Sequence, residues 1–250
     1  MKKYLKLIRV HHYIKNIIIF LPLFFSGKLL DMHLLIKCAL GFLVFGFISS
    51  AVYIINDIKD IENDRQHAEK SKRPLASGEV STRAALVLLF IMIAASVLLN
   101  YLSHGDSAAT WFILSAYLVL NIGYSFGLKN VPILDIAILV SGYLLRLILG
   151  SAITGIEISQ WLYLTIISIS FYLGLGKRRN ELLKYNDVSR KVLKSYTHDF
   201  LDKNMYMCLA LSIVFYALWC IDPMTVARVA SADLIWTVPI AILLSMRDSL

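Results

Sequence analysis

The sequence has too few cysteines, and none at suitable spacings, to support a disulfide framework or a zinc site. Its 250 residues include only Cys38, Cys208 and Cys220, and each lies in or beside an apolar segment. Zinc sites and disulfide-rich scaffolds need cysteines at short, repeated spacings. We therefore predict no disulfide and no zinc ion, and we expect the three thiols to pack as small apolar side chains.

Segments that would mark a second domain or a secreted protein are also missing. No stretch rich in proline, glycine and serine interrupts the chain, so we predict a single domain over residues 1–250. The basic start around Lys2, Lys3 and Lys6 leads into an apolar run, but no small-residue cleavage site follows it. We expect the N-terminus to be retained.

Long apolar runs are what the sequence has in excess. Hydrophobic residues make up 58% of the chain, against roughly half in a soluble domain. Crossing the hydrocarbon core takes about 20 helical residues, and a helix satisfies its own backbone polar groups in lipid. The sequence predicts an all-α, polytopic membrane bundle of about eight transmembrane helices. The runs are 14–27, 34–55, 84–102, 108–127, 131–153, 159–176, 204–221 and 232–246.

The net charge of +8 is distributed in a pattern typical of membrane topology rather than of nucleic-acid binding. Lys and Arg gather before the first run and in the loops 56–83, 128–130 and 177–203, while the intervening loops hold few. Cytoplasmic loops of membrane proteins carry such an excess. We therefore predict a multi-pass protein of the inner or plasma membrane, with both termini and these three loops in the cytoplasm.

The strongest functional signal lies where the second apolar run ends. Residues 56–64 read NDIKDIEND. On a helix that continues from this run, the i, i+3, i+7 spacing of Asp57, Asp60 and Asp64 places three carboxylates on one face. An alternative is a solvated acidic loop paired with local Lys and Arg. Carboxylates directly at a membrane boundary are costly without a function, which favours a site.

Three neighbouring carboxylates repel one another unless a cation joins them. Mg²⁺ prefers hard oxygen ligands and usually binds one or two carboxylates together with substrate phosphates. We predict that Asp57, Asp60 and Asp64 hold Mg²⁺ on a diphosphate, whose charge the metal neutralises. Lys72 and Arg73 follow in the same loop. They can bind phosphate oxygens, although they also fit the topology signal alone.

These motifs together resemble the first signature of the UbiA superfamily of intramembrane prenyltransferases. Asn56 opens the pattern N-D-x-x-D-x-x-x-D, and residues 72–75 continue it as KRPL. The resemblance implies a bundle of about nine transmembrane helices with a central cavity open to the cytoplasmic side and to lipid. It also implies two Asp-rich elements that bind Mg²⁺-diphosphate. Because the sequence ends at Leu250, we expect a UbiA-like domain that lacks the ninth helix.

A narrower resemblance is to the decaprenyl-phosphate phosphoribosyltransferase branch of this superfamily. In that branch the donor is 5-phosphoribosyl diphosphate and the acceptor is a polyprenyl phosphate. Of the second aspartate cluster only Asp135 is present, and Leu139 stands four residues on, which favours this branch over prenyl diphosphate donors. The resemblance is carried by VHHYIKN at 10–16, YSFGLK at 124–129, VPILD at 131–135, GYLLR at 142–146 and GKRRNE at 176–181.

The residues and the resemblance together indicate which side chains act on the substrates. Arg146 is an ionisable residue inside an apolar run, which is functional by default, although a salt bridge to another helix is an alternative. We predict that Lys129 and Arg146 act in catalysis with the three aspartates by steering two anionic substrates together. The predicted substrate-binding residues are Lys15, Asn16, Asn56, Lys72, Arg73, Tyr124, Asp135, Lys177, Arg178 and Arg179.

The predicted reaction is a Mg²⁺-dependent glycosyl transfer. The 5-phosphoribosyl group moves to a polyprenyl (decaprenyl) phosphate and diphosphate is released, with catalysis by positioning and charge neutralisation. One alternative is a conventional UbiA-type prenyltransferase with a prenyl diphosphate donor and an aromatic or other acceptor. A second is a transporter, whose ionisable residues should lie near the midplane of several helices. Here they gather at one membrane face.

Overall fold

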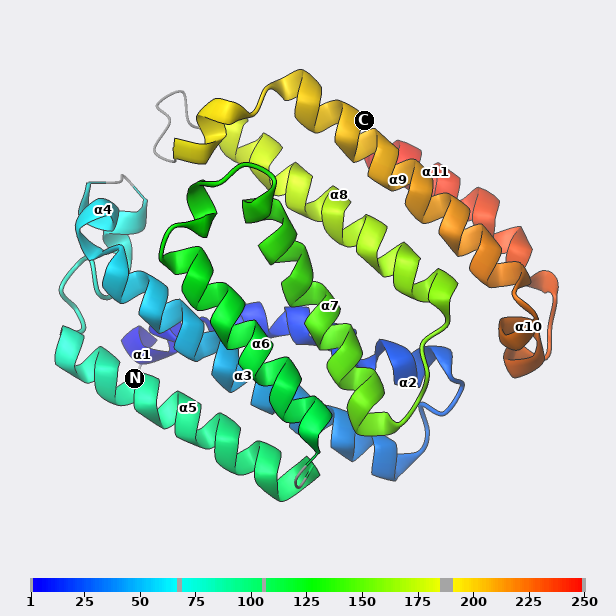
Figure 1. The fold of residues 1–250 in the computed structure, drawn as a ribbon, viewed down its shortest axis with the longest axis horizontal. Helices are drawn as coiled ribbons and strands as arrows, with labels where there is room; N and C mark the ends of the chain where they lie inside the picture. The colour runs from blue at the N-terminus through cyan, green and yellow to red at the C-terminus, as the bar shows by residue number, and fades with distance from the viewer. Residues whose placement is uncertain (1, 67–68, 105–106, 185–190, 249–250) are drawn as a thin grey trace. The chain divides into compact units, whose positions relative to one another are not determined.

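The structure, a computed structural model, describes residues 2–66, 69–104, 107–184 and 191–248. Every regular element in these ranges is helical, which confirms the predicted all-α class (Figure 1). The chain divides into two compact units. The first comprises Met1–Phe24, Lys28–Lys129 and Leu145–Gly155. The second comprises Phe25–Gly27, Asn130–Leu144 and Ile156–Leu250.

The first unit is built around the long helix α3 (Met32–Lys59). The elements that pack most extensively against it are the 3-10 helix η1 (Val10–Phe20), α5 (Thr82–His104) and α6 (Ala108–Ser125). Shorter helical segments complete this stretch of the chain. They are α1 (Lys2–Leu7), α2 (Leu21–Phe25), α4 (Ile61–Arg65), η2 (Lys70–Lys72) and η3 (Leu128–Asn130).

Two glycines let η1 lie close to its neighbours in this unit. Gly46 of α3 faces the ring of Tyr13, which a Cβ atom would approach to 2.5 Å. Gly150 belongs to the C-terminal part of α7 (Leu134–Thr154), and a Cβ atom there would lie 2.1 Å from the carbonyl oxygen of Ile19. Small residues allow such close packing of membrane helices, and here they fix the segment that follows Arg9.

The second unit is a set of helices arranged around α9 (His198–Ile221). α8 (Gln160–Lys184) and α11 (Val238–Asp248) pack along α9, and so do α10 (Pro223–Val229) and η5 (Asp233–Thr237). The N-terminal part of α7 and the short helix η4 (Lys191–Ser195) also belong to this unit. Its buried core joins Ile136 and Val140 of α7 to Leu175 of α8 and Leu201 of α9.

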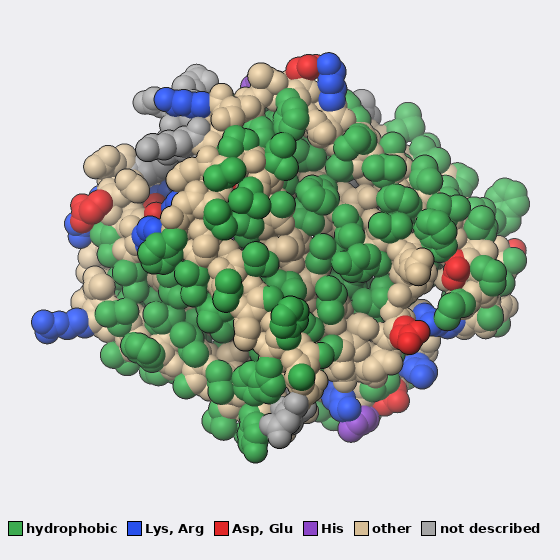
Figure 2. All heavy atoms as spheres, viewed as in Figure 1, with side chains coloured by type: hydrophobic (Ala, Val, Ile, Leu, Met, Phe, Trp, Pro, Cys, Tyr) green, Lys and Arg blue, Asp and Glu red, His purple; other side chains and the backbone are tan. Residues whose placement is uncertain are grey.

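Several helices are suited to lipid rather than to water. Among the described residues, five helices, α3, α5, α6, α7 and α9, are long and apolar enough to cross a membrane. A sixth span results if α10 and Asp233–Arg247, which are bent by 95°, count as one. Only 22% of the most apolar stretch of α5 and of α9 is buried, and hydrophobic side chains are spread over the visible face while charged ones lie mainly near its edges (Figure 2). Exposed apolar surface on this scale indicates an integral, multi-pass membrane protein.

The predicted number of eight spans stays a prediction. The run at 14–27 falls on η1 and α2, and Val10–Phe25 is shorter than a membrane-crossing helix. The run at 159–176 falls on α8, which continues into the polar sequence KRRNELLK at 177–184. The other predicted runs correspond to the five spanning helices and to the bent pair.

Candidate functional site

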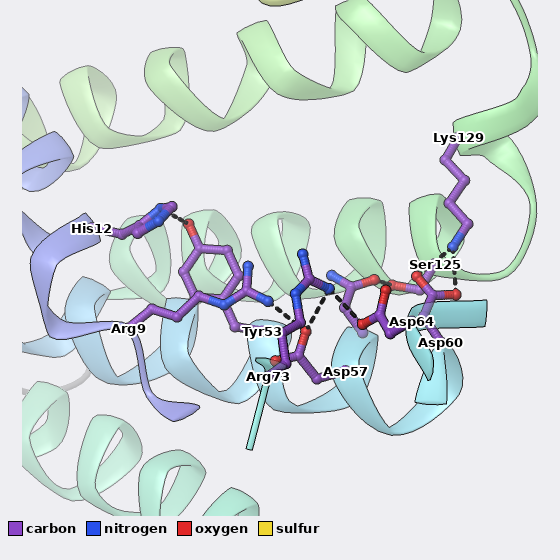
Figure 3. A network of polar contacts seen from close by, with 10 residues as sticks. Arg9, His12, Tyr53, Asp57, Asp60, Asp64, Arg73, Ser125 and Lys129 are labelled. Atoms are coloured by element: carbon purple, nitrogen blue, oxygen red, sulfur yellow. Dashed lines mark hydrogen bonds and ion pairs between the residues drawn. The ribbon is translucent and has the colours of Figure 1, made fainter. Parts of the chain in front are cut away.

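The acidic motif lies where α3 ends and α4 begins (Figure 3). α3 extends to Lys59, Asp60 turns the chain with φ −96° and ψ 10°, and α4 starts at Ile61. The helix expected to continue through the motif is therefore interrupted at Asp60. Asp57 and Asp64 are both buried, and they still lie on the same side of the turn because they bind the same guanidinium group.

Asp57 and Asp64 are paired with arginines from other segments of the first unit. The guanidinium of Arg9 donates to Asp57 Oδ1. Arg73 Nη1 lies 3.2 Å from the same oxygen and 2.7 Å from Asp64 Oδ2, so one nitrogen bridges the two carboxylates. Sequence analysis predicted that Arg73 binds phosphate; in the structure it binds the predicted metal ligands.

Asp60 has a different partner. The ammonium of Lys129 in η3 lies 2.7 Å from both of its carboxylate oxygens. The motif thus gathers three carboxylates and three cations, and its formal charges cancel. We call this group the aspartate network, and its members are Arg9, Asp57, Asp60, Asp64, Arg73 and Lys129 (Figure 3).

The end of α6 is joined to α3 beside these aspartates, which positions Lys129. The Ser125 hydroxyl lies within hydrogen-bond distance of the Asn56 side-chain oxygen and 2.8 Å from the backbone carbonyl of Asn121. Tyr124, a predicted substrate-binding residue, is buried at the same helix end. Asn56, also predicted to bind substrate, is therefore engaged in holding α6.

The aspartate network offers the oxygen ligands that a hard divalent cation needs. In the ranges that the structure describes, no three or more His, Cys, Asp or Glu side chains converge on one point. Asp57 and Asp64, however, lie close enough to share one guanidinium nitrogen. Mg²⁺ needs only one or two protein carboxylates when phosphates supply the other ligands. As a pair, Asp57 and Asp64 fit such an ion. Asp60, which pairs with Lys129, stays a predicted ligand.

Arg146 belongs to a second polar group of the first unit. Its Nε donates to Asn16 Oδ1 at 2.8 Å, and its Nη2 lies 3.2 Å from Ser49 Oγ. The guanidinium also packs over the rings of Phe45 and Tyr117. Arg146 and Asn16 are both buried, so the structure places these two predicted site residues as links between η1, α3 and α7.

The predicted residues Lys15 and Lys72 lie in two different parts of the first unit. Lys15 is close enough to Arg146 and Arg9 to experience the repulsion of both like charges. Gathered cations of this kind attract anionic ligands. Lys72 has an exposed side chain at the end of η2, and its backbone carbonyl accepts a hydrogen bond from Lys6 Nζ at 2.9 Å.

The second unit contains a buried ionic group built on Asp135, in the first turn of α7. Its Oδ2 accepts from Arg178 Nε, and its Oδ1 accepts from the Tyr196 hydroxyl, each at 2.6 Å. The Tyr196 oxygen accepts the backbone N–H of Ile133, and Arg178 Nη1 donates to Glu181 at 2.7 Å. We call these the Asp135 network, and its members are Asp135, Arg178, Glu181 and Tyr196.

The central pair of the Asp135 network, Asp135 and Arg178, is buried away from solvent, although Glu181 is 25% exposed. The side chains of Asp135 and Arg178 are both 0% exposed. Burial, followed by the hydrogen bond to Asp135, raises the pKa of Tyr196 to about 12, so this hydroxyl stays a donor at neutral pH. Nearby on α8, Arg179 pairs with Asp202 of α9 and Lys177 is exposed. A substrate role for these predicted residues stays a prediction.

Sequence analysis missed Arg9 and Tyr196 as members of these networks, and Tyr53 as the ring beside Arg9. Arg9 adopts a left-handed conformation with φ 53° and ψ 50°, and its guanidinium stacks over the Tyr53 ring at 4.8 Å. The Tyr53 hydroxyl lies 3.3 Å from His12 Nδ1 (Figure 3). Tyr53 precedes Asp57 by one helical turn, so helical spacing could have identified it. Contacts of Arg9 and Tyr196 depend on the packing of distant segments.

Comparison with known proteins shows which family this chain is similar to. The UbiA prenyltransferase family model matches residues 17–247. The decaprenyl-phosphate phosphoribosyltransferase of Corynebacterium glutamicum is 34% identical to this chain, and the alignment covers 87% of the chain and 67% of that protein. The protein of the same name from Mycobacterium tuberculosis is 30% identical over 87% of the chain and 73% of its own length.

Solved structures show the same fold. A UbiA homolog from Archaeoglobus fulgidus bound to DMAPP and Mg²⁺ aligns with a TM-score of 0.74 and 19% identity. The alignment covers 98% of this chain and 88% of that one. The resemblance inferred from residues 56–64 and 72–75 is thereby confirmed along nearly the whole sequence.

Proposed function

Because the chain belongs to the UbiA prenyltransferase family, we propose that it transfers a 5-phosphoribosyl group from 5-phosphoribosyl diphosphate to a polyprenyl phosphate such as decaprenyl phosphate. Relatives that carry this name are 30–34% identical over most of the chain. The observation that carries the proposal is the aspartate network, in which two buried carboxylates, a partly exposed one and three partly exposed cations gather at one end of α3. Such a group suits a metal-bound diphosphate.

Asp57 and Asp64 would hold Mg²⁺, which when bound neutralises charge on the departing diphosphate. A related UbiA homolog binds this ion together with DMAPP. Arg73 bridges the two carboxylates, and its guanidinium can offer parallel donors to phosphate oxygens. Lys129 lies at the same end of α3 and adds a compact positive charge. These side chains position the donor so that its bond from C1 to the diphosphate can break.

The acceptor needs little activation, because a phosphate oxygen is already anionic near neutral pH. This oxygen forms the new bond to C1 of the ribose while the diphosphate leaves. Lys15, near Arg146 and Arg9, provides positive charge that would draw the acceptor phosphate toward the donor. Catalysis then rests mainly on positioning and on charge neutralisation.

We also propose the membrane arrangement that this chemistry requires. The chain forms one UbiA-like domain over 1–250 with about eight spans, and its central cavity opens to the cytoplasm and to lipid. The polyprenyl tail lies along apolar helix surface such as that of α5. The Lys and Arg content of the loops 56–83, 128–130 and 177–203 supports a cytoplasmic site and cytoplasmic termini.

The test is a transfer assay with membranes that contain the full chain. Radiolabelled 5-phosphoribosyl diphosphate and decaprenyl phosphate are supplied with Mg²⁺ or with EDTA, and labelled prenyl diphosphate with an aromatic acceptor is supplied in parallel. We expect label in the lipid product only from the phosphoribosyl donor, and only with Mg²⁺. Transfer from the prenyl donor alone would instead identify a conventional prenyltransferase.

Two variants link the activity to the site. Asp57→Ala removes a carboxylate that the proposal assigns to the metal, and we expect loss of transfer. Glu62→Ala is the matched control, because Glu62 lies in the same motif but its side chain is 80% exposed and pairs with Arg65 three residues away. Full activity of Asp57→Ala would refute the proposed site.

A further inference from the structure

Asp57 has two guanidinium partners although it carries one charge. Arg9 and Arg73 both donate to its Oδ1, and the carboxylate is almost fully buried. Neither arginine shares this burial, since the side chain of Arg9 is 18% exposed and that of Arg73 is 31% exposed. The carboxylate is therefore fixed in the protein, while its cationic partners keep contact with the surroundings from which a ligand would arrive.

The backbone around Arg9 is anchored on both sides. Leu7 is fully buried in the core of the first unit, and the Ile8 carbonyl accepts a hydrogen bond from Ser50 Oγ at 2.8 Å. Tyr13, a few residues later, contacts the same hydroxyl at 2.9 Å. Arg9 itself holds the left-handed conformation, which few non-glycine residues adopt and which persists only where the surroundings enforce it.

The side chain of Arg9, in contrast, rests on an aromatic ring rather than being enclosed by the core. Its guanidinium stacks on Tyr53, one helical turn before Asp57 on α3 (Figure 3). Stacking on an aromatic face stabilises a guanidinium without fixing which anion it binds. A rotation of the side chain can therefore exchange the anion while the stacking is kept.

The charge balance of the aspartate network determines which ligand can take the Arg9 guanidinium from Asp57. Three carboxylates already face three cations, so a bare divalent cation competes with two guanidinium groups for Asp57. A metal–diphosphate complex is different, because the diphosphate brings oxygens that accept the displaced guanidinium. Guanidinium groups bind phosphate at least as well as carboxylate.

We propose that Arg9 occupies the cation position on Asp57 in the unliganded protein and transfers its guanidinium to the diphosphate when the metal–diphosphate complex binds. Arg9 is thus a ligand of the donor diphosphate and a competitor of the free metal ion. This inference rests on the proposed function insofar as the site takes a metal-bound diphosphate. It gives a physical reason for ordered binding, in which the metal enters with the diphosphate rather than before it.

The experiment measures binding rather than turnover. The purified full chain in lipid nanodiscs is titrated with Mn²⁺, whose free concentration is followed by electron paramagnetic resonance, first alone and then with inorganic diphosphate. For Arg9→Gln we expect Mn²⁺ alone to bind about tenfold more tightly, because Asp57 has lost a competing cation. Diphosphate in the presence of Mn²⁺ should bind about tenfold more weakly, the effect of one lost charge-assisted hydrogen bond.

Two further variants complete the design. Arg83→Gln removes an exposed arginine at the start of α5 and should behave as the unaltered protein in both titrations. Arg9→Lys keeps the positive charge but loses the fork of donors. It should leave Mn²⁺ binding alone nearly unchanged and weaken diphosphate binding, and it decides the question if Arg9→Gln does not fold.

The inference is overturned if Arg9→Gln weakens Mn²⁺ binding in the absence of diphosphate, which would make Arg9 an organiser of the metal ligands. Diphosphate affinity that stays unchanged in both Arg9 variants overturns it as well. Inorganic diphosphate makes the result independent of the group that is transferred. If the titrations show the expected effects of Arg9 but the transfer assay shows no phosphoribosyl transfer, the protein uses another diphosphate donor. If phosphoribosyl transfer occurs but the titrations do not show these effects, this inference is wrong and the proposed function stands.

Discussion

The aspartate network and the Asp135 network use the same residue types in opposite ways. In the first, the arginines and the lysine that pair with the carboxylates keep between 18% and 31% of their side chains exposed. In the second, Asp135 and Arg178 are completely buried, and both oxygens of the carboxylate are engaged. An ion pair that retains solvent contact can exchange partners, whereas a sealed one cannot without a large desolvation penalty.

This comparison bears on the second aspartate element of the family resemblance. Asp135 is the only carboxylate of that element in the sequence, and the structure places it with Arg178 and Tyr196 inside the second unit. Tyr196 directly follows η4, and Arg178 lies on α8, so the contacts fasten both segments to the start of α7. We interpret Asp135 as a residue that organises this unit, and the aspartate network as the metal-binding element.

The largest effect is expected when the buried pair is broken. Asp135→Asn removes the buried one of the two carboxylates that pair with Arg178 and leaves the fully buried guanidinium with the partly exposed Glu181 alone. Breaking such a buried pair costs about 3 kcal/mol of folding free energy. Thermal unfolding in detergent, followed by circular dichroism, should show a much lower midpoint. If Asp135→Asn abolished transfer and raised the Mg²⁺ requirement at an unchanged midpoint, Asp135 would belong to the metal site.

A double substitution is the matched control for this prediction. Asp135→Leu combined with Arg178→Met replaces both charges by apolar side chains of similar size, which is often neutral for stability. The double variant should therefore unfold at a higher temperature than Asp135→Asn. A double variant less stable than the single one would mean that losing the contacts with Glu181 and Tyr196 costs more than the buried charges do.

A substitution in the aspartate network is expected to have an intermediate effect. It should lower the transfer activity rather than the stability of the fold. Asp64→Asn removes one carboxylate of the pair that shares Arg73, and we expect transfer to fall about 100-fold, or about 2.7 kcal/mol. Stability should change by less than about 1 kcal/mol, because Arg73 is partly exposed and loses only one of two carboxylates. A large loss of stability with normal activity would reverse the contrast between the two networks.

Much of the fold and the gathering of the three aspartates could be predicted from the sequence, because local spacing and composition determine them. The contrast between the two networks was not predicted, since Asp135 and Arg178 were expected to bind substrate. The apolar runs predict the spanning helices, and the spacing of Asp57, Asp60 and Asp64 predicts that they gather at one helix end. The break at Asp60 was not predicted, since a single backbone angle causes it. Arg9 and Tyr196 were missed because their partners lie 48 and 61 residues away in the sequence, and only packing brings such residues together.

The smallest effect tests how tightly the Asp135 network is sealed. Tyr196→Phe removes the hydroxyl that donates to Asp135 and accepts from the Ile133 backbone, and the lost hydrogen bonds should cost about 1 kcal/mol. The folded-state pKa of about 12 lies above the ordinary value of 10.0. The contribution of this hydroxyl is therefore complete below pH 10 and is lost as the pH rises toward 12.

The stability difference between the unaltered protein and Tyr196→Phe should accordingly be constant from pH 7 to about pH 10 and shrink above it. Urea unfolding of both proteins across this range measures the difference directly. Tyr206→Phe is a suitable control, because Tyr206 is 61% exposed on α9. A difference that shrank already near pH 8 would mean that the Tyr196 hydroxyl ionises readily. The Asp135 network would then be open to solvent, like the aspartate network.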